Sequence, residues 1–208
     1  SGVWLPLNVA HLWFLYFLAL YAALGWLLAL IFSRQTTFTI ASKNVFSILF
    51  QSVWLRLVVM IALYFGCLYW MGSTGIRTNN KWEIDPATFI TYFVFFGTGW
   101  MIYKTNSLVS LAGFPIWQLS VATILFLIAN MTPWPDESWV FVIKQGFTAV
   151  YGSLFIFGFI AFFITYFSHY SRWLNYQMDA AYWVYIIHLP IVAFVPGVIA
   201  TIALPAVV

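Results

Sequence analysis

The chain has 208 residues, of which 64% are hydrophobic and only 6% are charged, whereas soluble domains carry about a quarter charged residues. A soluble fold of this size exposes too much surface to hide so much apolar side chain, so the composition excludes a water-soluble globular protein. The net charge of +3 is spread over isolated residues without a basic run, which argues against nucleic acid as a partner.

A membrane span needs about 20 apolar residues, and six segments of the chain fit this requirement. They cover residues 9–32, 53–71, 86–103, 111–130, 139–167 and 180–204. We interpret all six as helices, because lipid leaves only helices and closed barrels as spanning structures, and the alternating strands of a barrel are not evident in the sequence. The sequence therefore predicts an all-α, polytopic transmembrane helix bundle, a single membrane domain over residues 1–208 whose surroundings are the lipid bilayer.

Local signals mark the ends of several segments. The uncharged stretch Asn44–Leu55 has apolar residues at helical spacing and predicts a helix that lies on the membrane interface and leads into the second span. Asp85 followed by Pro86 predicts a helix start, since aspartate is a good N-cap and proline fits the first helical position. We expect Pro115 either to bend the fourth span or to mark its true start.

The charged residues between the spans favour one orientation. Arg34 and Lys43 follow the first span, Lys104 follows the third and Arg172 follows the fifth, whereas the other two connections contain acidic residues as well. The positive-inside rule therefore predicts that these three connections face the cytoplasm and that both ends of the chain face outward.

Polar side chains are costly inside a membrane, so the few near the spans are candidates for function. His11 lies at the outer entrance of the first span, either as an interfacial residue or as a site residue that faces an outward cavity. Arg56, near the cytoplasmic end of the second span, either snorkels to water or binds phosphate or carboxylate groups. His188 lies inside the sixth span, where an imidazole needs a partner, and Tyr185 precedes it by three residues on the same helix face. No Asp or Glu lies within a span, and the sequence has no metal-binding pattern.

Three segments resemble motifs of the acyltransferase-3 family of membrane acyltransferases. His11–Leu18 (HLWFLYFL) is similar to the family's HLWFL-type motif, and Tyr182–Pro190 (YWVYIIHLP) is similar to its final-helix YxxYxxH motif. Between them, Tyr92–Trp100 followed by Lys104 is similar to a helix of the family with two phenylalanines, a glycine and then a basic residue. The motifs occur in the family's order, and the chain is most similar to its glucan-modifying branch, typified by glucans biosynthesis protein C.

This resemblance implies transfer of an acetyl or succinyl group from cytoplasmic acetyl-CoA or succinyl-CoA to an outward-facing sugar hydroxyl of a glycan acceptor. It implies a multi-pass protein of the bacterial inner membrane that uses no metal. His188 and Tyr185 would shape the pocket, His11 and Trp13 would lie near the acceptor, and Arg56 would hold the phosphates of CoA.

The resemblance covers only the C-terminal part of that family. Members begin with a helix that carries an Arg-and-His motif, whose histidine is taken as catalytic, and this sequence has no counterpart to that helix. No residue is therefore assigned as catalytic. We expect the chain to be the C-terminal part of a larger acyltransferase domain, to partner the missing N-terminal helices of the same protein and to be inactive alone.

Two other classes stay open from the residues alone. In a transporter or channel subunit, the fourth and sixth spans, interrupted by Pro115, Pro190 and Pro196, would line a pathway. In a structural or assembly factor, small residues spaced four apart would support close helix packing. Such pairs are Ala19/Ala23 and Ala149/Ser153.

Overall fold

A computed structural model describes residues 13–32, 36–79, 82–135, 137–169 and 171–181, together with positions 183, 184, 187 and 191. Within these residues every regular element is helical, which confirms the predicted all-α class. The chain divides into two compact units, Ser1–Phe167 and Ser168–Val208. The helices of the first unit are α1 (Trp13–Phe32), α2 (Thr36–Gln51), α3 (Val53–Met71), α4 (Pro86–Lys104), the short 3-10 helix η2 (Val109–Leu111), α5 (Pro115–Met131) and α6 (Ser138–Phe167).

The junction of α2 and α3 differs from the expected single helix over Asn44–Leu55. Ser52 has an extended backbone (φ −91°, ψ 119°), and its hydroxyl accepts a hydrogen bond from the backbone N–H of Leu55 at 3.3 Å. Ser52 therefore ends α2 and caps α3, because a side-chain oxygen at this position satisfies one of the free N–H groups of the new helix. α2 also begins earlier than expected, at Thr36.

The other two predicted helix starts are confirmed. Asp85 caps α4, where its carboxylate accepts hydrogen bonds from the backbone N–H of Thr88 at 3.0 Å and from the Thr88 hydroxyl at 2.5 Å, and Pro86 is the first helical residue. Pro115 is the first residue of α5. The fourth span therefore starts at Pro115 and not at Leu111, which belongs to η2. Since Pro115 begins a helix and does not break one, it gives no support to a pathway lined by a broken fourth span.

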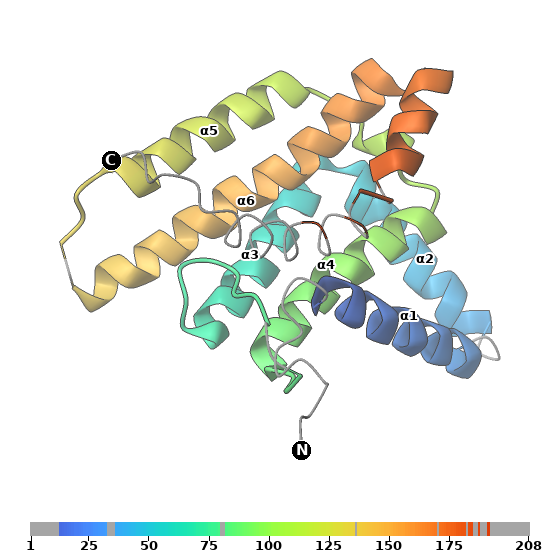
Figure 1. Cartoon of the computed structure of the whole chain (residues 1–208), viewed down its shortest axis with the longest axis horizontal. Coiled ribbons are helices and arrows are strands. Elements are labelled where there is room, and N and C mark those ends of the chain that lie inside the picture. The colour runs from blue at the N-terminus through green and yellow to red at the C-terminus, as the bar shows by residue number, and fades with distance from the viewer. Residues whose placement is uncertain are drawn as a thin grey trace, which may run out of the picture. The chain divides into compact units, whose positions relative to one another are not determined.

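α6 is the central helix of the first unit and packs against α3 and α5 (Figure 1). Two glycines let the neighbouring side chains approach its backbone. A Cβ atom at Gly152 would lie 2.6 Å from the ring of Tyr64, and one at Gly158 would lie 3.0 Å from the side chain of Leu119. The small residues Ala149 and Ser153 on α6 are completely buried, so this predicted pair does support close helix packing, whereas Ala19 and Ala23 of α1 are exposed.

Buried polar side chains show which helix ends lie together. Arg56, at the start of α3, donates a hydrogen bond to the carbonyl of Ser110, between α4 and α5. Gln145, near the start of α6, donates to the carbonyls of Leu68 and Ser73 at the end of α3. The connections before α3 and after α4 therefore share one end of the bundle. The positive-inside rule predicts this for Lys43, which lies in α2 before α3, and for Lys104, which is the last residue of α4.

Three helices are long and apolar enough to cross a membrane: residues Trp13–Ile31 of α1, Val53–Met71 (α3) and Ser138–Phe167 (α6). Their outward faces expose large apolar side chains, for example Trp26 at 67%, Val58 at 62% and Phe163 at 55%. Water would penalise such faces, whereas lipid hydrocarbon would not. The chain is thus a helical membrane protein.

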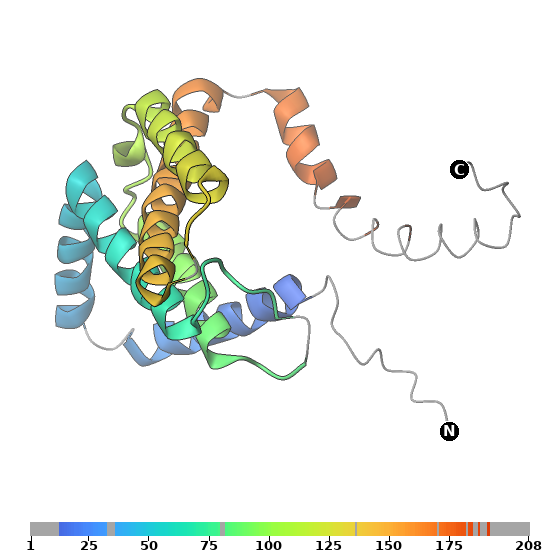
Figure 2. The same cartoon turned by 90° about the vertical axis from the view of Figure 1, so that its left-hand side faces the viewer.

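α1 occupies the edge of the first unit, beside α4 (Figure 1). Figure 2 shows α1 running across the direction of α6. Its contacts with α4 are made by long aromatic side chains: Phe17 lies 5.4 Å from Phe89 between ring centroids, and Tyr21 lies 4.8 Å from the same ring. Large rings therefore form the contact between the two helices, and the candidate site lies beside it.

Candidate functional site

Of the five residues that the sequence analysis selected, the structure describes Trp13 and Arg56. His11, Tyr185 and His188 lie outside the described residues. Trp13 is the first residue of α1, and its ring lies 5.0 Å from that of Tyr92 on α4, between centroids. Trp13 belongs to the segment His11–Leu18, and Tyr92 opens the segment Tyr92–Trp100. The contact therefore joins two of the segments that resemble motifs of the acyltransferase-3 family.

A hollow of about 190 Å³ lies between α1 and α4, next to this contact. Seven of the eight residues that line it are aromatic, and the eighth is a leucine. The lining residues are Trp13, Phe14, Phe17, Leu18, Tyr21, Tyr92, Phe95 and Phe96. The lining residues from α1 form two rows with a spacing of four residues, which places them on one face of the helix. The rows are Trp13, Phe17 and Tyr21, and Phe14 and Leu18.

The polar side-chain atoms of the lining residues are the two tyrosine hydroxyls and the indole N–H of Trp13. The Tyr21 hydroxyl donates a hydrogen bond of 2.8 Å to the backbone carbonyl of Phe89. The Tyr92 hydroxyl makes no hydrogen bond with any described residue. It is also not one of the buried polar atoms that lack a hydrogen-bond partner. The hollow is therefore an aromatic compartment, and among the described residues the Tyr92 hydroxyl has no hydrogen-bond partner. The sequence analysis missed Tyr21, although its spacing of four residues from Phe17 and eight from Trp13 was a usable signal.

Arg56 is buried, with only 1% of its surface exposed. Its Nη1 donates to the carbonyls of Phe50 at 3.1 Å and Ser110 at 2.9 Å, its Nη2 donates to the carbonyl of Leu111 at 3.4 Å, and its guanidinium lies 5.5 Å from the ring centroid of Phe157. The side chain thus ties the end of α2, the η2 region and α6 to the start of α3.

These contacts bear on both roles considered for Arg56. A snorkelling arginine keeps its charged head in water, whereas this head lies in the protein interior. A phosphate-binding arginine presents its donor fork to the ligand, whereas three of the donor contacts here are made to backbone carbonyls. CoA binding by Arg56 stays a prediction that the observed contacts do not favour.

Two buried glutamines were overlooked in the sequence, although an amide inside an apolar span was a visible signal. Gln118 on α5 and Gln145 on α6 are each 1% exposed. Gln145 donates to the carbonyls of Leu68 and Ser73 at the end of α3, and the Leu68 carbonyl also accepts from the backbone N–H of Ser73. Four buried atoms have no hydrogen-bond partner among the described residues. They are Arg56 Nε, Gln118 Oε1, Gln145 Oε1 and Ser153 Oγ.

Charge is scarce near the hollow. The carboxylate nearest in sequence to the α4 lining residues is Asp85, the cap of α4, and the hydrogen bonds from Thr88 hold its pKa below the ordinary value. Among the residues that the structure describes, no three or more His, Cys, Asp or Glu side chains come together in a way that could hold a metal ion. The described part of the site thus offers stacking surfaces and hydroxyls, and no titratable base.

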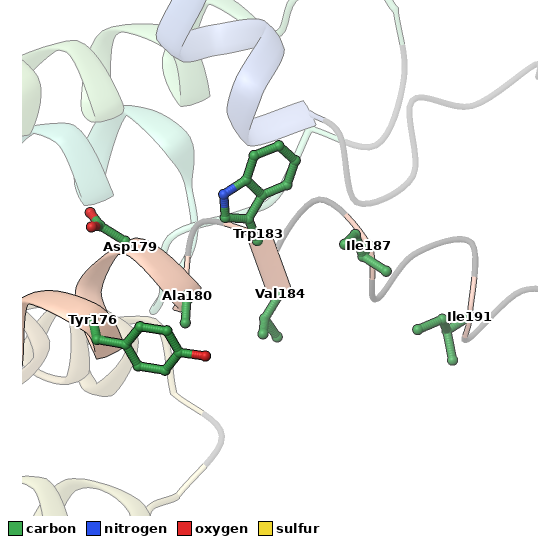
Figure 3. A pocket seen from close by; sticks show the side chains of 7 residues that line it. All are labelled: Tyr176, Asp179, Ala180, Trp183, Val184, Ile187 and Ile191. Atoms are coloured by element: carbon green, nitrogen blue, oxygen red, sulfur yellow. The ribbon is translucent and has the colours of Figure 1, made fainter. Parts of the chain in front are cut away.

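In the second unit, residues 172–181 are helical, and an open hollow of about 480 Å³ lies along seven residues whose positions repeat with the period of a helix turn (Figure 3). These residues are Tyr176, Asp179, Ala180, Trp183, Val184, Ile187 and Ile191. The spacing puts them on one helix face. Tyr176 and Trp183 are 70% and 66% exposed. Nothing in the structure shows what covers this face, so it is assigned no function.

No protein-family model, no curated protein and no solved structure matches the chain.

Proposed function

We propose that the chain is part of an integral membrane O-acyltransferase. The reaction transfers an acetyl or succinyl group from acyl-CoA to a sugar hydroxyl of a glycan or cell-envelope glucan. The sugar oxygen attacks the thioester carbonyl, a C–O bond forms and the C–S bond breaks, and a general base passes the hydroxyl proton to the departing thiolate of CoA. In this proposal the base comes from further helices of the same protein in a bacterial inner membrane.

The observation that carries the proposal is the contact of Trp13 with Tyr92. It brings together the two described segments that resemble family motifs, around a hollow lined by aromatic rings. A tryptophan ring at the edge of such a hollow is a stacking surface for one face of a sugar ring, and positioning an acceptor in this way lowers the entropic cost of the reaction.

The remaining expected residues take the following roles in the proposal. His188 and Tyr185 shape the acyl-transfer pocket, and His11 lies near the acceptor. CoA binding by Arg56 stays an expectation, which its hydrogen bonds to backbone carbonyls do not favour. The chain crosses the membrane through α1, α3, α4, α5, α6 and residues 180–204, which gives the six passes expected from the sequence.

Acyl transfer is measured with radiolabelled acetyl-CoA and succinyl-CoA in membranes that contain the native protein, with label counted in the glycan fraction. Trp13→Ala removes the stacking surface and is expected to lower transfer about tenfold, the equivalent of one good aromatic contact. Trp26→Ala is the matched control, because Trp26 lies on the same helix, is 67% exposed and does not line the hollow. Absence of acyl-CoA-dependent transfer in the unsubstituted protein would contradict the proposal.

A further inference from the structure

Two of the buried atoms that lack a hydrogen-bond partner among the described residues have complementary chemistry. Arg56 Nε carries an N–H group that can only donate, and Gln118 Oε1 can only accept. Both side chains are 1% exposed, so bulk solvent does not satisfy these atoms. A buried donor or acceptor without a partner lowers stability by its full desolvation cost. Each atom therefore needs a partner that the described residues do not supply.

A contact between α3 and α5 brings the two side chains into the same part of the first unit. The rings of Trp54 on α3 and Trp117 on α5 are 6.0 Å apart between centroids, so the starts of these two helices lie side by side. Arg56 follows Trp54 by two residues, and Gln118 follows Trp117 directly. The two tryptophans are partly or fully exposed, whereas Arg56 and Gln118 are buried beneath them.

The contacts of α6 place the two side chains together a second time. The Arg56 guanidinium lies 5.5 Å from the ring centroid of Phe157. Gly158 is the next residue of α6, and a Cβ atom there would lie 3.3 Å from the Cβ atom of Gln118. Arg56 also donates to the carbonyl of Leu111, in the short helix that precedes α5. The two side chains thus contact consecutive residues of α6 from neighbouring helices.

The chemistry of the two atoms identifies the missing partner. An anion would be repelled by the Gln118 oxygen, and a cation would be repelled by the Arg56 guanidinium. A neutral molecule that both accepts and donates suits both atoms, and water is the usual partner of buried polar groups that the protein leaves unsatisfied. A buried water needs two to four polar partners. The carbonyl oxygens of Ser110 and Leu111, each with a second lone pair, are further acceptors beside the guanidinium.

We propose that one buried water molecule bridges Arg56 Nε and Gln118 Oε1 where the starts of α3 and α5 meet α6. The Nε–H donates to the water, and the water donates to Oε1, with each hydrogen bond about 2.8 Å long. The bridge joins α3 to α5 and places a further dipole beside the buried charge of Arg56. It does not depend on acyl transfer, so it holds whatever reaction the chain takes part in.

X-ray footprinting of the protein in nanodiscs tests the bridge. Radiolysis turns water into hydroxyl radicals, which oxidise the side chains that contact bulk or bound water, and mass spectrometry locates the oxidised residues. Phe157 is 1% exposed, whereas Phe159 is 49% exposed and lies about 3 Å further along the same helix. Without a bound water, oxidation follows exposure and is greater at Phe159. The bridge predicts greater oxidation at Phe157, and oxidation of Phe157 no greater than that of Phe159 would overturn the proposal.

Two variants sharpen this test. Gln118→Leu removes the acceptor, and the oxidation of Phe157 is expected to fall below that of Phe159. Gln51→Leu makes the same change at an exposed amide of α2 and is expected to leave the oxidation of Phe157 unchanged. Unchanged oxidation of Met71, which is buried at the far end of α3, shows that a variant is folded. Full oxidation of Phe157 in folded Gln118→Leu would overturn the assignment of Gln118 as a partner of the water.

Discussion

The contacts of α6 and the contact of α1 with α4, all in the first unit, are built in different ways. α6 meets α3 and α5 through glycines and small residues, and buried side chains such as Gln145 fix the backbones to one another. α1 meets α4 through rings at centroid distances of 4.8 to 6.2 Å. Among the described residues, the Tyr21 hydroxyl donates a hydrogen bond from α1 to the carbonyl of Phe89 on α4.

This difference separates a part of the molecule that is closely packed from a part that leaves room for a ligand. Small residues allow backbones to approach, and interdigitated side chains then fill the space without voids. Large rings prefer edge-to-face arrangements, which keep the helices apart and leave a hollow of about 190 Å³. We expect added bulk to be harmful at α3–α6 and tolerated at α1–α4.

The largest effect is expected at Arg56, which holds the closely packed region together. Arg56→Met removes the donors for the carbonyls of Phe50, Ser110 and Leu111, and each buried carbonyl left without a partner costs about 1–3 kcal/mol. The free energy of unfolding in detergent micelles is expected to fall by about 3 kcal/mol or more. Arg77→Met is the control, because Arg77 is exposed and, within the described part of the chain, its hydrogen bond goes to the single carbonyl of Gly72. An equal fall in the free energy of unfolding of the two variants would show that the hydrogen bonds of Arg56 do not stabilise the helix contacts.

A smaller effect is expected from added bulk at the α3–α6 contact. Gly152→Ala places a Cβ atom 2.6 Å from the ring of buried Tyr64, and overpacking of this kind costs about 1–3 kcal/mol. Gly146→Ala is the matched control on the same helix, since a Cβ atom there has no neighbour within 4 Å. Thermal unfolding monitored by circular dichroism distinguishes the two variants.

The difference between the α3–α6 and α1–α4 contacts predicts that added side-chain volume lowers the unfolding temperature at the first and not at the second. Leu18→Trp adds a larger group to the α1–α4 hollow than Gly152→Ala adds to the α3–α6 contact. We expect Leu18→Trp to leave the unfolding temperature nearly unchanged. A loss in Leu18→Trp as large as that in Gly152→Ala would mean that the α1–α4 contact is as closely packed as the core.

The smallest effect concerns the cap of α4. The hydrogen bonds from Thr88 hold the pKa of Asp85 below its ordinary value, so the ionised carboxylate stabilises the folded state above the unfolded pKa of about 3.9, and this contribution is lost as the pH falls through the folded pKa. Asp85→Asn keeps a capping oxygen but does not titrate. The advantage of the unsubstituted protein over Asp85→Asn, about 0.5 kcal/mol for an exposed cap, is therefore expected at pH 7 and is expected to shrink as the pH falls through the lowered pKa of Asp85. An advantage that is constant with pH would contradict this assignment.

Features fixed by local chemistry could be predicted from the sequence. The starts of α4 at Pro86 and α5 at Pro115 follow from capping and from the restrictions of proline. The end of α2 at Ser52 was missed, because it depends on one extended residue whose neighbour Arg56 bonds to segments distant in the sequence. Which aromatic residues face one another depends on how the helices cross, so hydropathy alone could not find the α1–α4 hollow.

The contact of Trp13 on α1 with Tyr92 on α4 supports the proposed function more than any other observation, and cysteine crosslinking tests it most directly. In a background in which Cys67, the single cysteine, is replaced by alanine, the pair Trp13→Cys and Tyr92→Cys is treated with a short thiol crosslinker in membranes. The account predicts efficient crosslinking of this pair and none of the control pair Trp26→Cys and Tyr92→Cys, because Trp26 lies about 20 Å further along α1 and is exposed. No crosslink at Trp13, or equal crosslinking of both pairs, would contradict it.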